Sequence, residues 1–280
     1  MTLLDPKNDF VFKKLFASEP ELLAELINAV REGEAPIEVV EVINPRIEPE
    51  ELTGKFIVLD ILARDAQGRR YDIEMQVRRH NAWGARSAFY LARMLADQLP
   101  SGHDYSALKP VIGIHLLDFE LFEEPGQQSQ PLWCFEMRDA RQPDVRLGRE
   151  FQLNLVELRK ADRLGLNSGN LADWIAFFEH WQEEDKMNEI AYPPVRQALA
   201  GIKHLSADAE TRRLAFVRER ALRDEASLMR QEREQGRAEG KIEGKIEGKI
   251  EGRAEGLQEA LDRLIGCGIS EEQARRMLGL

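Results

Sequence analysis

The chain has 280 residues, of which 50 are Asp or Glu and 39 are Lys or Arg, so its formal net charge is −11. This acidic balance argues against a general nucleic-acid-binding surface, so any contact with DNA has to come from a local basic patch. Two distant cysteines exclude a disulfide framework and a CxxC zinc site and favour a reducing compartment, for which we expect the cytoplasm. No stretch approaches the ~18 uncharged apolar residues of a membrane span. Asp5 and Lys7 precede any apolar run, which argues against a secretory signal.

Residues 1–160 predict a mixed α/β domain. Phe10, Phe12 and Phe16 form an apolar stripe at helical spacing, which continues after Pro20. The strands that we expect are the short β-branched segment IEVVEV (37–42), the pair KFIVLDILAR (55–64) and RYDIEMQVRR (70–79), and the segments 110–122, 131–139 and 150–158. A second helical pattern covers 81–99. This order indicates a mixed sheet flanked by helices.

The remaining sequence predicts a helical region over 161–235, a repeat over 236–256 and a terminal amphipathic element over 257–280. Four aromatic residues recur at helical spacing and indicate core packing, namely Trp174, Phe177, Phe178 and Trp181. In the repeat, glycine returns every four residues and the core unit is KIEG. In the last segment, Ser270 to Gln273 form a capping box that opens a short helix.

The repeat leaves three interpretations open. Each interior glycine costs a helix ~1 kcal/mol relative to alanine, and like charges repel at a spacing of four residues. These costs favour a flexible or marginally helical spacer. Ile242, Ile246 and Ile250 also lie four residues apart, so a helix that forms on self-association, giving a homo-oligomer, is the second interpretation. The third interpretation is that the lysine row contacts nucleic acid, and the alternating glutamates argue against this because they cancel its charge.

The strand pair at 55–79 contains the residues that could carry chemistry. The loop Ala66-Gln67-Gly68 suits a type I turn followed by glycine in the left-handed region. That loop sets a register in which Asp60 lies opposite Glu74. Because strand side chains alternate, Asp72, Glu74 and Gln76 share one face of the sheet.

Two carboxylates that face each other repel, and a divalent cation between them removes the repulsion. Hard cations such as Mg²⁺ prefer carboxylate oxygens, and Gln76 on the same face could orient a water molecule. The alternative is a solvated hairpin face with ordinary surface acids. His115 lies within an apolar strand, where we expect a core residue whose neighbours satisfy its hydrogen bonds.

The hairpin resembles the D…(D/E)xK core of the PD-(D/E)XK nuclease superfamily in the form D…ExQ, with Asp60 followed by YDIEMQ at 71–76. The wider pattern resembles the Rpn family of recombination-promoting nucleases, also described as PD-(D/E)XK transposase-like proteins. The matching stretches are KNDFVFKKLF (7–16), VLDILARDAQGRRYDIEMQ (58–76), ARSAFYLARMLADQL (85–99), GHDYSALKPVIGIHLLDF (102–119), the Trp174 helix region, RERALRDEASLM (218–229) and the GxxxG-type tail. D…ExQ alone recurs by chance, whereas its combination with these ordered blocks is fairly specific.

The resemblance implies a restriction-endonuclease-like core and a metal-dependent DNA endonuclease. It implies that Asp60 and Glu74 bind Mg²⁺, or alternatively Mn²⁺ or Ca²⁺, with the main-chain carbonyl of Met75 as the third protein ligand. Gln76 stands where the superfamily more often has lysine, and it supplies a dipole in place of a positive charge. Asp9 lies where the superfamily often places an extra acid. It is either a contact to the metal or its water, or an acid favoured by the dipole at a helix start.

A local excess of positive charge surrounds this motif. Residues 64–93 contain seven arginines and three acids, so 7 − 3 gives a local charge of +4. Arg86, Tyr90 and Arg93 recur at i, i+4 and i+7, which places them on one helix face. Together with Arg78 and Arg79 they are the expected contacts to DNA phosphates. The alternative is a helix whose polar face carries arginine without a ligand.

The function that we expect is phosphodiester hydrolysis in DNA, in recombination, transposition-like processes or defence. A rival hypothesis is a nuclease fold with weak or no catalysis that serves as a DNA-binding or oligomerising scaffold, which Gln76 in place of lysine favours. A third hypothesis is a protein-interaction module that depends on the tail and has no affinity for DNA.

Overall fold

The computed structural model describes residues 2–44, 46, 60–79, 82–99, 102, 104–166 and 169–280. Contacts between residues divide the chain into two units, Met1–Leu222 and Arg223–Leu280. The strands of the first unit are β1 (Val39–Val42), β2 (Ile61–Asp65), β3 (Arg70–Gln76), β4 (Val111–Leu117), β5 (Leu132–Glu136) and β6 (Phe151–Glu157). Its helices are α1 (Asp9–Ala17), α2 (Pro20–Val30), α4 (Trp83–Ala96), α5 (Leu158–Arg163), α6 (Asn170–His180), α7 (Glu184–Glu189), α8 (Pro193–Ala207) and the start of α9 (Ala209–Gly266), with a 3₁₀ turn at Tyr105–Ala107.

The six strands form one mixed sheet in the order β1-β2-β3-β4-β6-β5, which confirms the predicted fold class. In the centre, β4 runs parallel to both β3 and β6, whereas β1 with β2, β2 with β3 and β5 with β6 are antiparallel pairs. In the hairpin, Ile61 pairs with Ile73 and Ala63 with Tyr71. This is the register that the three-residue loop predicts, and Gly68 takes the positive φ of 80° that such a loop requires. Residues 55–59 of the predicted first strand lie outside the described residues.

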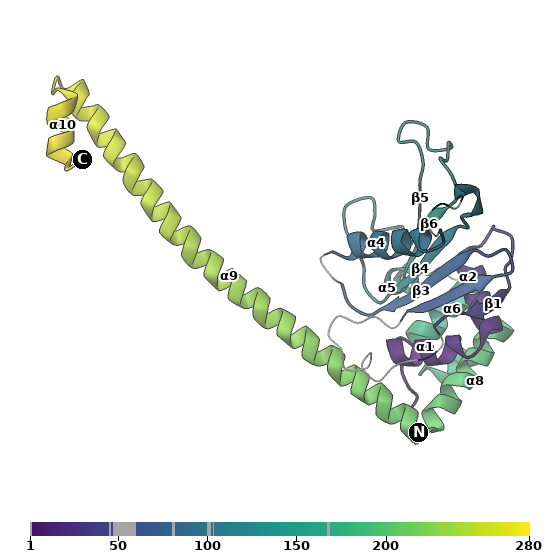
Figure 1. The fold of residues 1–280 in the computed structure, drawn as a ribbon. Helices are drawn as coiled ribbons and strands as arrows, with labels where there is room; N and C mark the ends of the chain where they lie inside the picture. The colour runs from purple at the N-terminus through teal and green to yellow at the C-terminus, as the bar shows by residue number, and fades with distance from the viewer. Residues whose placement is uncertain are drawn as a thin grey trace. The chain divides into compact units, whose positions relative to one another are not determined.

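The two faces of the sheet are covered by different helices (Figure 1). One face carries Ile73 and Met75 of β3 and packs against α1, α2, α6 and α8 in the main hydrophobic core. The opposite face is covered by α4, whose Trp83 and Leu91 pack against β4 and β6 in a smaller apolar cluster. The alternation along β3 therefore turns Asp72, Glu74 and Gln76 toward α4. The acids thus lie between sheet and helix.

The helices follow their sequence signals closely. Asn8 caps α1 by accepting hydrogen bonds from the backbone N–H groups of Phe10 and Val11, and Pro20 occupies the first turn of α2. The helical pattern that continues after Pro20 is thus divided into two helices at Ser18. Trp174 of the predicted aromatic helix is fully buried in α6, against Phe16 of α1. Phe177 and Phe178 are buried as predicted, whereas Trp181 follows the end of α6 and is partly exposed.

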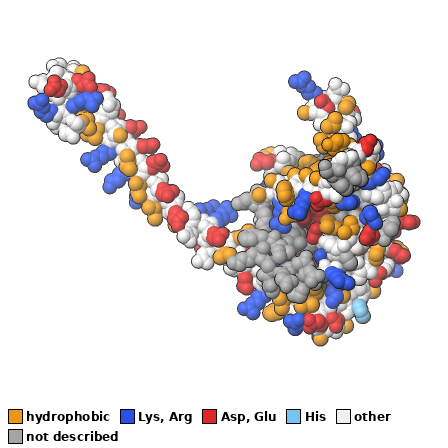
Figure 2. Space-filling model, viewed as in Figure 1, with side chains coloured by type: hydrophobic (Ala, Val, Ile, Leu, Met, Phe, Trp, Pro, Cys, Tyr) orange, Lys and Arg blue, Asp and Glu red, His pale blue; other side chains and the backbone are white. Residues whose placement is uncertain are grey.

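The second unit consists of the rest of α9 and α10 (Glu271–Leu278). The helix continues through the whole glycine repeat. A Cβ atom added at any of its six glycines would meet nothing within 4 Å. Hydrophobic, basic and acidic side chains form separate rows along this helix (Figure 2). Ser270 caps α10 by accepting from the N–H of Gln273, as the capping box predicts. Within the described part of the chain, no helix combines the length and the apolar character that crossing a bilayer needs.

Candidate metal centre

Asp60 lies immediately before β2 and is held by a side chain from the end of β1. The amide of Asn44 donates to the main-chain oxygen of Asp60 at 3.2 Å and to its carboxylate at 3.4 Å. The side-chain oxygen of Asn44 accepts from the N–H of Leu62 at 2.6 Å. Asn44 therefore fixes both the start of β2 and the position of the Asp60 carboxylate.

Glu74 and Gln76 lie two residues apart on β3, and both are buried under α4. The Gln76 amide donates a hydrogen bond of 2.7 Å to the Glu74 carboxylate. Gln76 is thereby placed to orient Glu74. Met75, between them, turns its side chain into the opposite core, and its carbonyl belongs to the backbone of β3.

A histidine from the neighbouring strand joins these acids. β3 and β4 are parallel, and Glu74 pairs with His115 while Asp72 pairs with Gly113. The His115 ring is fully buried, with Nε2 3.8 Å from Asp72 Oδ2 and Nδ1 4.0 Å from Glu74 Oε2. Its ring packs edge-on against Trp83. His115 is thus buried, as expected, but the prediction that its neighbours satisfy its hydrogen bonds is wrong, because its Nε2 has no hydrogen-bond partner among the described residues and the ring adjoins the acids of the site.

Burial and mutual repulsion shape the charge of this group. Burial and the neighbouring charges of Asp72 and Glu74 raise the pKa of Asp60 to about 7, against a smaller opposing effect of the Lys13 ammonium. Burial also raises the pKa of Glu74, although His115 counteracts it. Burial alone would lower the pKa of His115, but the surrounding carboxylates outweigh that effect and raise it. The site therefore has an excess of negative charge that a cation would offset.

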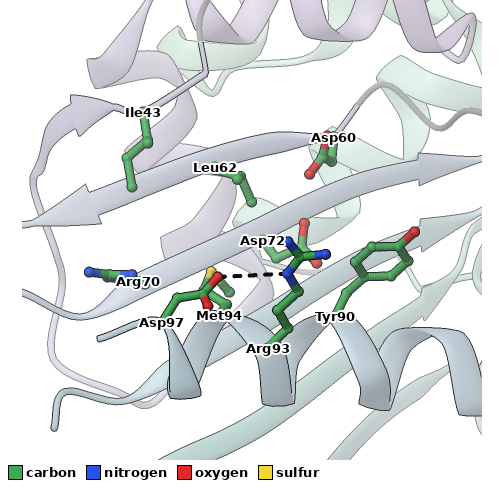
Figure 3. A pocket seen from close by; sticks show the side chains of 9 residues that line it. All are labelled: Ile43, Asp60, Leu62, Arg70, Asp72, Tyr90, Arg93, Met94 and Asp97. Carbon is green, nitrogen blue, oxygen red and sulfur yellow. Dashed lines mark ion pairs between the residues drawn. The ribbon is translucent and has the colours of Figure 1, made fainter. Parts of the chain in front are cut away.

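A pocket of about 320 Å³ opens beside the acids (Figure 3). Asp60 and Asp72 line it from the sheet, and Tyr90 and Arg93 line it from α4. Arg93 is exposed and lies 3.8 Å from Asp97 Oδ2, one turn along the helix. An acidic floor and a basic rim therefore border the same cavity.

The other predicted DNA contacts take different positions around this cavity. The Arg86 guanidinium lies 5.4 Å from the centre of the Tyr90 ring. Its positive charge acts to lower the pKa of Glu74, against the effect of burial. Arg78 follows β3 and is partly exposed. Arg79 is exposed and forms an ion pair of 3.1 Å with Glu123. Of the predicted contacts, Tyr90 and Arg93 line the pocket and Arg86 lies beside it.

Asp9 lies at the first turn of α1 and bonds a basic side chain. Its two carboxylate oxygens accept from Arg218 of α9 at 2.6 to 3.0 Å, and both side chains are buried. One oxygen also accepts from the N–H of Phe10. This carboxylate thus links the start of α1 to α9.

The donor set fits a divalent cation. Among the described residues, Asp72, Glu74 and His115 place one ligand atom each within 4.8 Å of one another. Asp72 Oδ1 and His115 Nε2 are buried and have no hydrogen-bond partner among the described residues. Unpartnered buried polar atoms are costly, and a cation would satisfy both.

Sequence reasoning placed Asp72 on the correct face but assigned it no role, and it gave no role at the site to His115, Asn44 or Lys13. A signal existed for His115, because Gly113 and His115 are the two non-apolar positions on one face of an otherwise apolar strand. Its partner strand and register were unknown, so that signal pointed to no site.

A protein-family model described as "PD-(D/E)XK nuclease family transposase" matches residues 6–232. Among curated proteins and solved structures, none matches this chain. The matched region contains the whole sheet, the acids and the pocket-lining face of α4.

Proposed function

Since the chain belongs to the PD-(D/E)XK nuclease family transposases, we propose that it is a divalent-metal-dependent endonuclease that hydrolyses phosphodiester bonds in DNA. The observation that carries this proposal is the pocket in which Asp60 and Asp72 face Tyr90 and Arg93. A phosphodiester needs positive charge along its backbone and a carboxylate-held metal at the bond that breaks. Asp60 and Asp72 supply carboxylates to this cavity and Arg93 supplies a positive charge, and Glu74 follows Asp72 by two residues on the same face of β3. The role would lie in recombination, transposition-like processes or defence.

Some residues of this chain would bind the metal, and others would position the substrate. Asp60 and Glu74 would hold the ion, with the main-chain carbonyl of Met75 as a further ligand, and Mg²⁺, Mn²⁺ and Ca²⁺ all suit such oxygen donors. An ion held there would supply a Lewis acid for a phosphoryl oxygen and would lower the pKa of a bound water. Gln76 fixes Glu74 through its hydrogen bond.

The substrate is positioned from α4. Arg86 and Arg93 attract the phosphates, and the half-exposed Tyr90 ring offers a surface for a sugar or a base. Arg78 and Arg79, which follow β3, would add further positive charge for the DNA backbone. Because these contacts address the DNA backbone, we expect binding that weakens with salt and depends little on sequence.

Plasmid nicking tests the proposal. We expect the full-length protein to nick supercoiled DNA with Mg²⁺ or Mn²⁺ and to lose this activity with EDTA. Asp60→Ala and Glu74→Ala should each reduce the rate by on the order of 1,000-fold, because removing a metal ligand removes stabilisation of the transition state. Glu210→Ala, which removes an exposed acid at the start of α9, should leave the rate unchanged. Activity that persists in both folded site variants would remove these residues from the mechanism.

The rival function is a scaffold that binds DNA without cutting it. Gln76 favours it, because an amide stands where the family pattern more often has a positive charge. Fluorescence anisotropy with labelled DNA distinguishes the two functions when it is run beside the nicking assay. Salt-sensitive binding without metal-dependent turnover would support the scaffold and contradict the nuclease.

A further inference from the structure

The buried group of Asp72, Glu74 and His115 contains a nitrogen donor as well as two carboxylates. The parallel register of β3 and β4 brings these side chains to one face beneath α4. The separations of 3.8 and 4.0 Å between the imidazole and the two carboxylates are too long for hydrogen bonds. The three groups therefore face one another without bonding directly, as donors to a shared ligand do.

Two of these residues carry a buried polar atom without a hydrogen-bond partner. Asp72 is 3% exposed and His115 is 0% exposed, and neither Asp72 Oδ1 nor His115 Nε2 has a hydrogen-bond partner among the described residues. A buried polar atom without a partner has lost its hydrogen bonds to water and gains none in the fold. Two such atoms in one cluster indicate that a bound species satisfies them.

A serine of α4 favours the histidine tautomer that can bind a metal. Ser87 Oγ donates to the main-chain oxygen of Trp83 at 3.1 Å, so its lone pairs are available to accept. His115 Nδ1 lies 3.4 Å from this oxygen. A proton on Nδ1 directed at Ser87 leaves the lone pair on Nε2, the atom that faces Asp72. Hydrogen bonds of this kind orient metal-binding histidines in proteins.

We propose that His115 Nε2 is a metal ligand together with Asp72 and Glu74, so that this centre prefers first-row transition-metal ions such as Mn²⁺ over Mg²⁺ and Ca²⁺. This inference deepens the metal dependence proposed above and rests on it, because Glu74 belongs to both ligand sets. Imidazole nitrogen is a softer donor than carboxylate oxygen, and it adds affinity for transition-metal ions that Mg²⁺ and Ca²⁺ do not gain.

Metal binding to the full-length, EDTA-stripped protein tests the proposal without an activity assay. By isothermal titration calorimetry, we expect Mn²⁺ to bind at least about tenfold more tightly than Mg²⁺. His115→Gln should lower the Mn²⁺ affinity on the order of 100-fold and the Mg²⁺ affinity by less than about tenfold. His180→Gln changes a partly buried histidine that pairs with Asp162 and Glu183, and it should leave both affinities unchanged.

Electron spin-echo envelope modulation on the Mn²⁺-loaded wild type gives a readout that needs no variant. A nitrogen-14 modulation from a bound imidazole supports the proposal, even if His115→Gln does not fold. Absence of that modulation, or an unchanged Mn²⁺ affinity in folded His115→Gln, would overturn it, because His115 would then be a counter-charge to the acids. Nicking that needs Asp60 and Glu74 but shows no nitrogen ligand rejects this inference alone. A nitrogen ligand without nicking rejects the nuclease function alone.

Discussion

Asp60 is partly buried beside Asp72 and Glu74, and this burial and the charges of the two acids raise its pKa from 3.8 to about 7. Between pH 3.8 and about pH 7, the Asp60 carboxyl group keeps a proton in the folded protein that it has lost in the unfolded chain. The folded state therefore binds more protons, so this group's contribution to stability is complete below pH 3.8 and is lost as the pH rises through about 7. A cation would reverse the effect by favouring the ionised form. The group of acids that suits a cation thus lowers the stability of the metal-free protein.

Asp60→Asn should stabilise the metal-free protein at pH 8. The amide carries no charge beside the two acids, and the gain should be on the order of 2–4 kcal/mol, since each pKa unit corresponds to about 1.4 kcal/mol. The difference between variant and wild type should vanish near pH 4. Thermal unfolding in EDTA across this pH range measures it, with the exposed Asp97→Asn as a control from the same pocket. A variant that is less stable than the wild type at pH 8 would contradict the assigned pKa.

At the scale of elements, the junction of β6 and α5 is held by a buried ion pair. Lys160 lies 2.7 Å from Glu157, and neither side chain is exposed. Glu157 also accepts from Trp133 Nε1 and from the N–H groups of Leu121 and Phe122. This network ties the loop after β4 and the edge strand β5 to the end of β6. It thereby supports the parallel strands that bring His115 to β3.

Lys160→Met should destabilise the protein by about 3–5 kcal/mol, because it leaves the Glu157 carboxylate buried without a cation. The last residue of α5, Arg163, forms a more exposed ion pair that provides the control. Arg163 bonds Glu120 at 2.9 Å, and Arg163→Met should cost less than about 1 kcal/mol because water screens that pair. Urea unfolding measures the free energy of unfolding of both variants. Equal costs for the two variants would show that the buried network carries no special stability.

At the scale of the whole molecule, the chain joins a packed unit to a helical tail. The buried pair of Asp9 and Arg218 anchors the start of α9 within the first unit. In the tail, Ile242, Ile246 and Ile250 are 55–64% exposed, so a row of large apolar side chains lacks packing partners among the described residues. A row of this kind favours association with a second copy of the chain.

A chain that ends at Gln235 should contain fewer copies per particle in solution than the full-length protein. Burying an isoleucine side chain yields about 1.5–3 kcal/mol, so loss of the three isoleucines should abolish association through the tail. Light scattering after size exclusion measures the mass. Ile242→Gln, Ile246→Gln and Ile250→Gln combined should act like the truncation, and Lys245→Gln should not. An unchanged number of copies per particle in the truncated protein would show that the tail does not hold copies together.

The sequence by itself determined the local features. The loop at Gly68 set the hairpin register because a three-residue turn permits one pairing, and the alternation along β3 put Asp72, Glu74 and Gln76 on one face. Capping residues and Pro20 placed the helices because their effects act within one turn. Tertiary structure alone decided that His115 lies beside Glu74, that α4 carries Tyr90 and Arg93 to the acids, and that Arg218 meets Asp9. Parallel strand register and helix docking depend on packing between distant segments, and no local pattern encodes them.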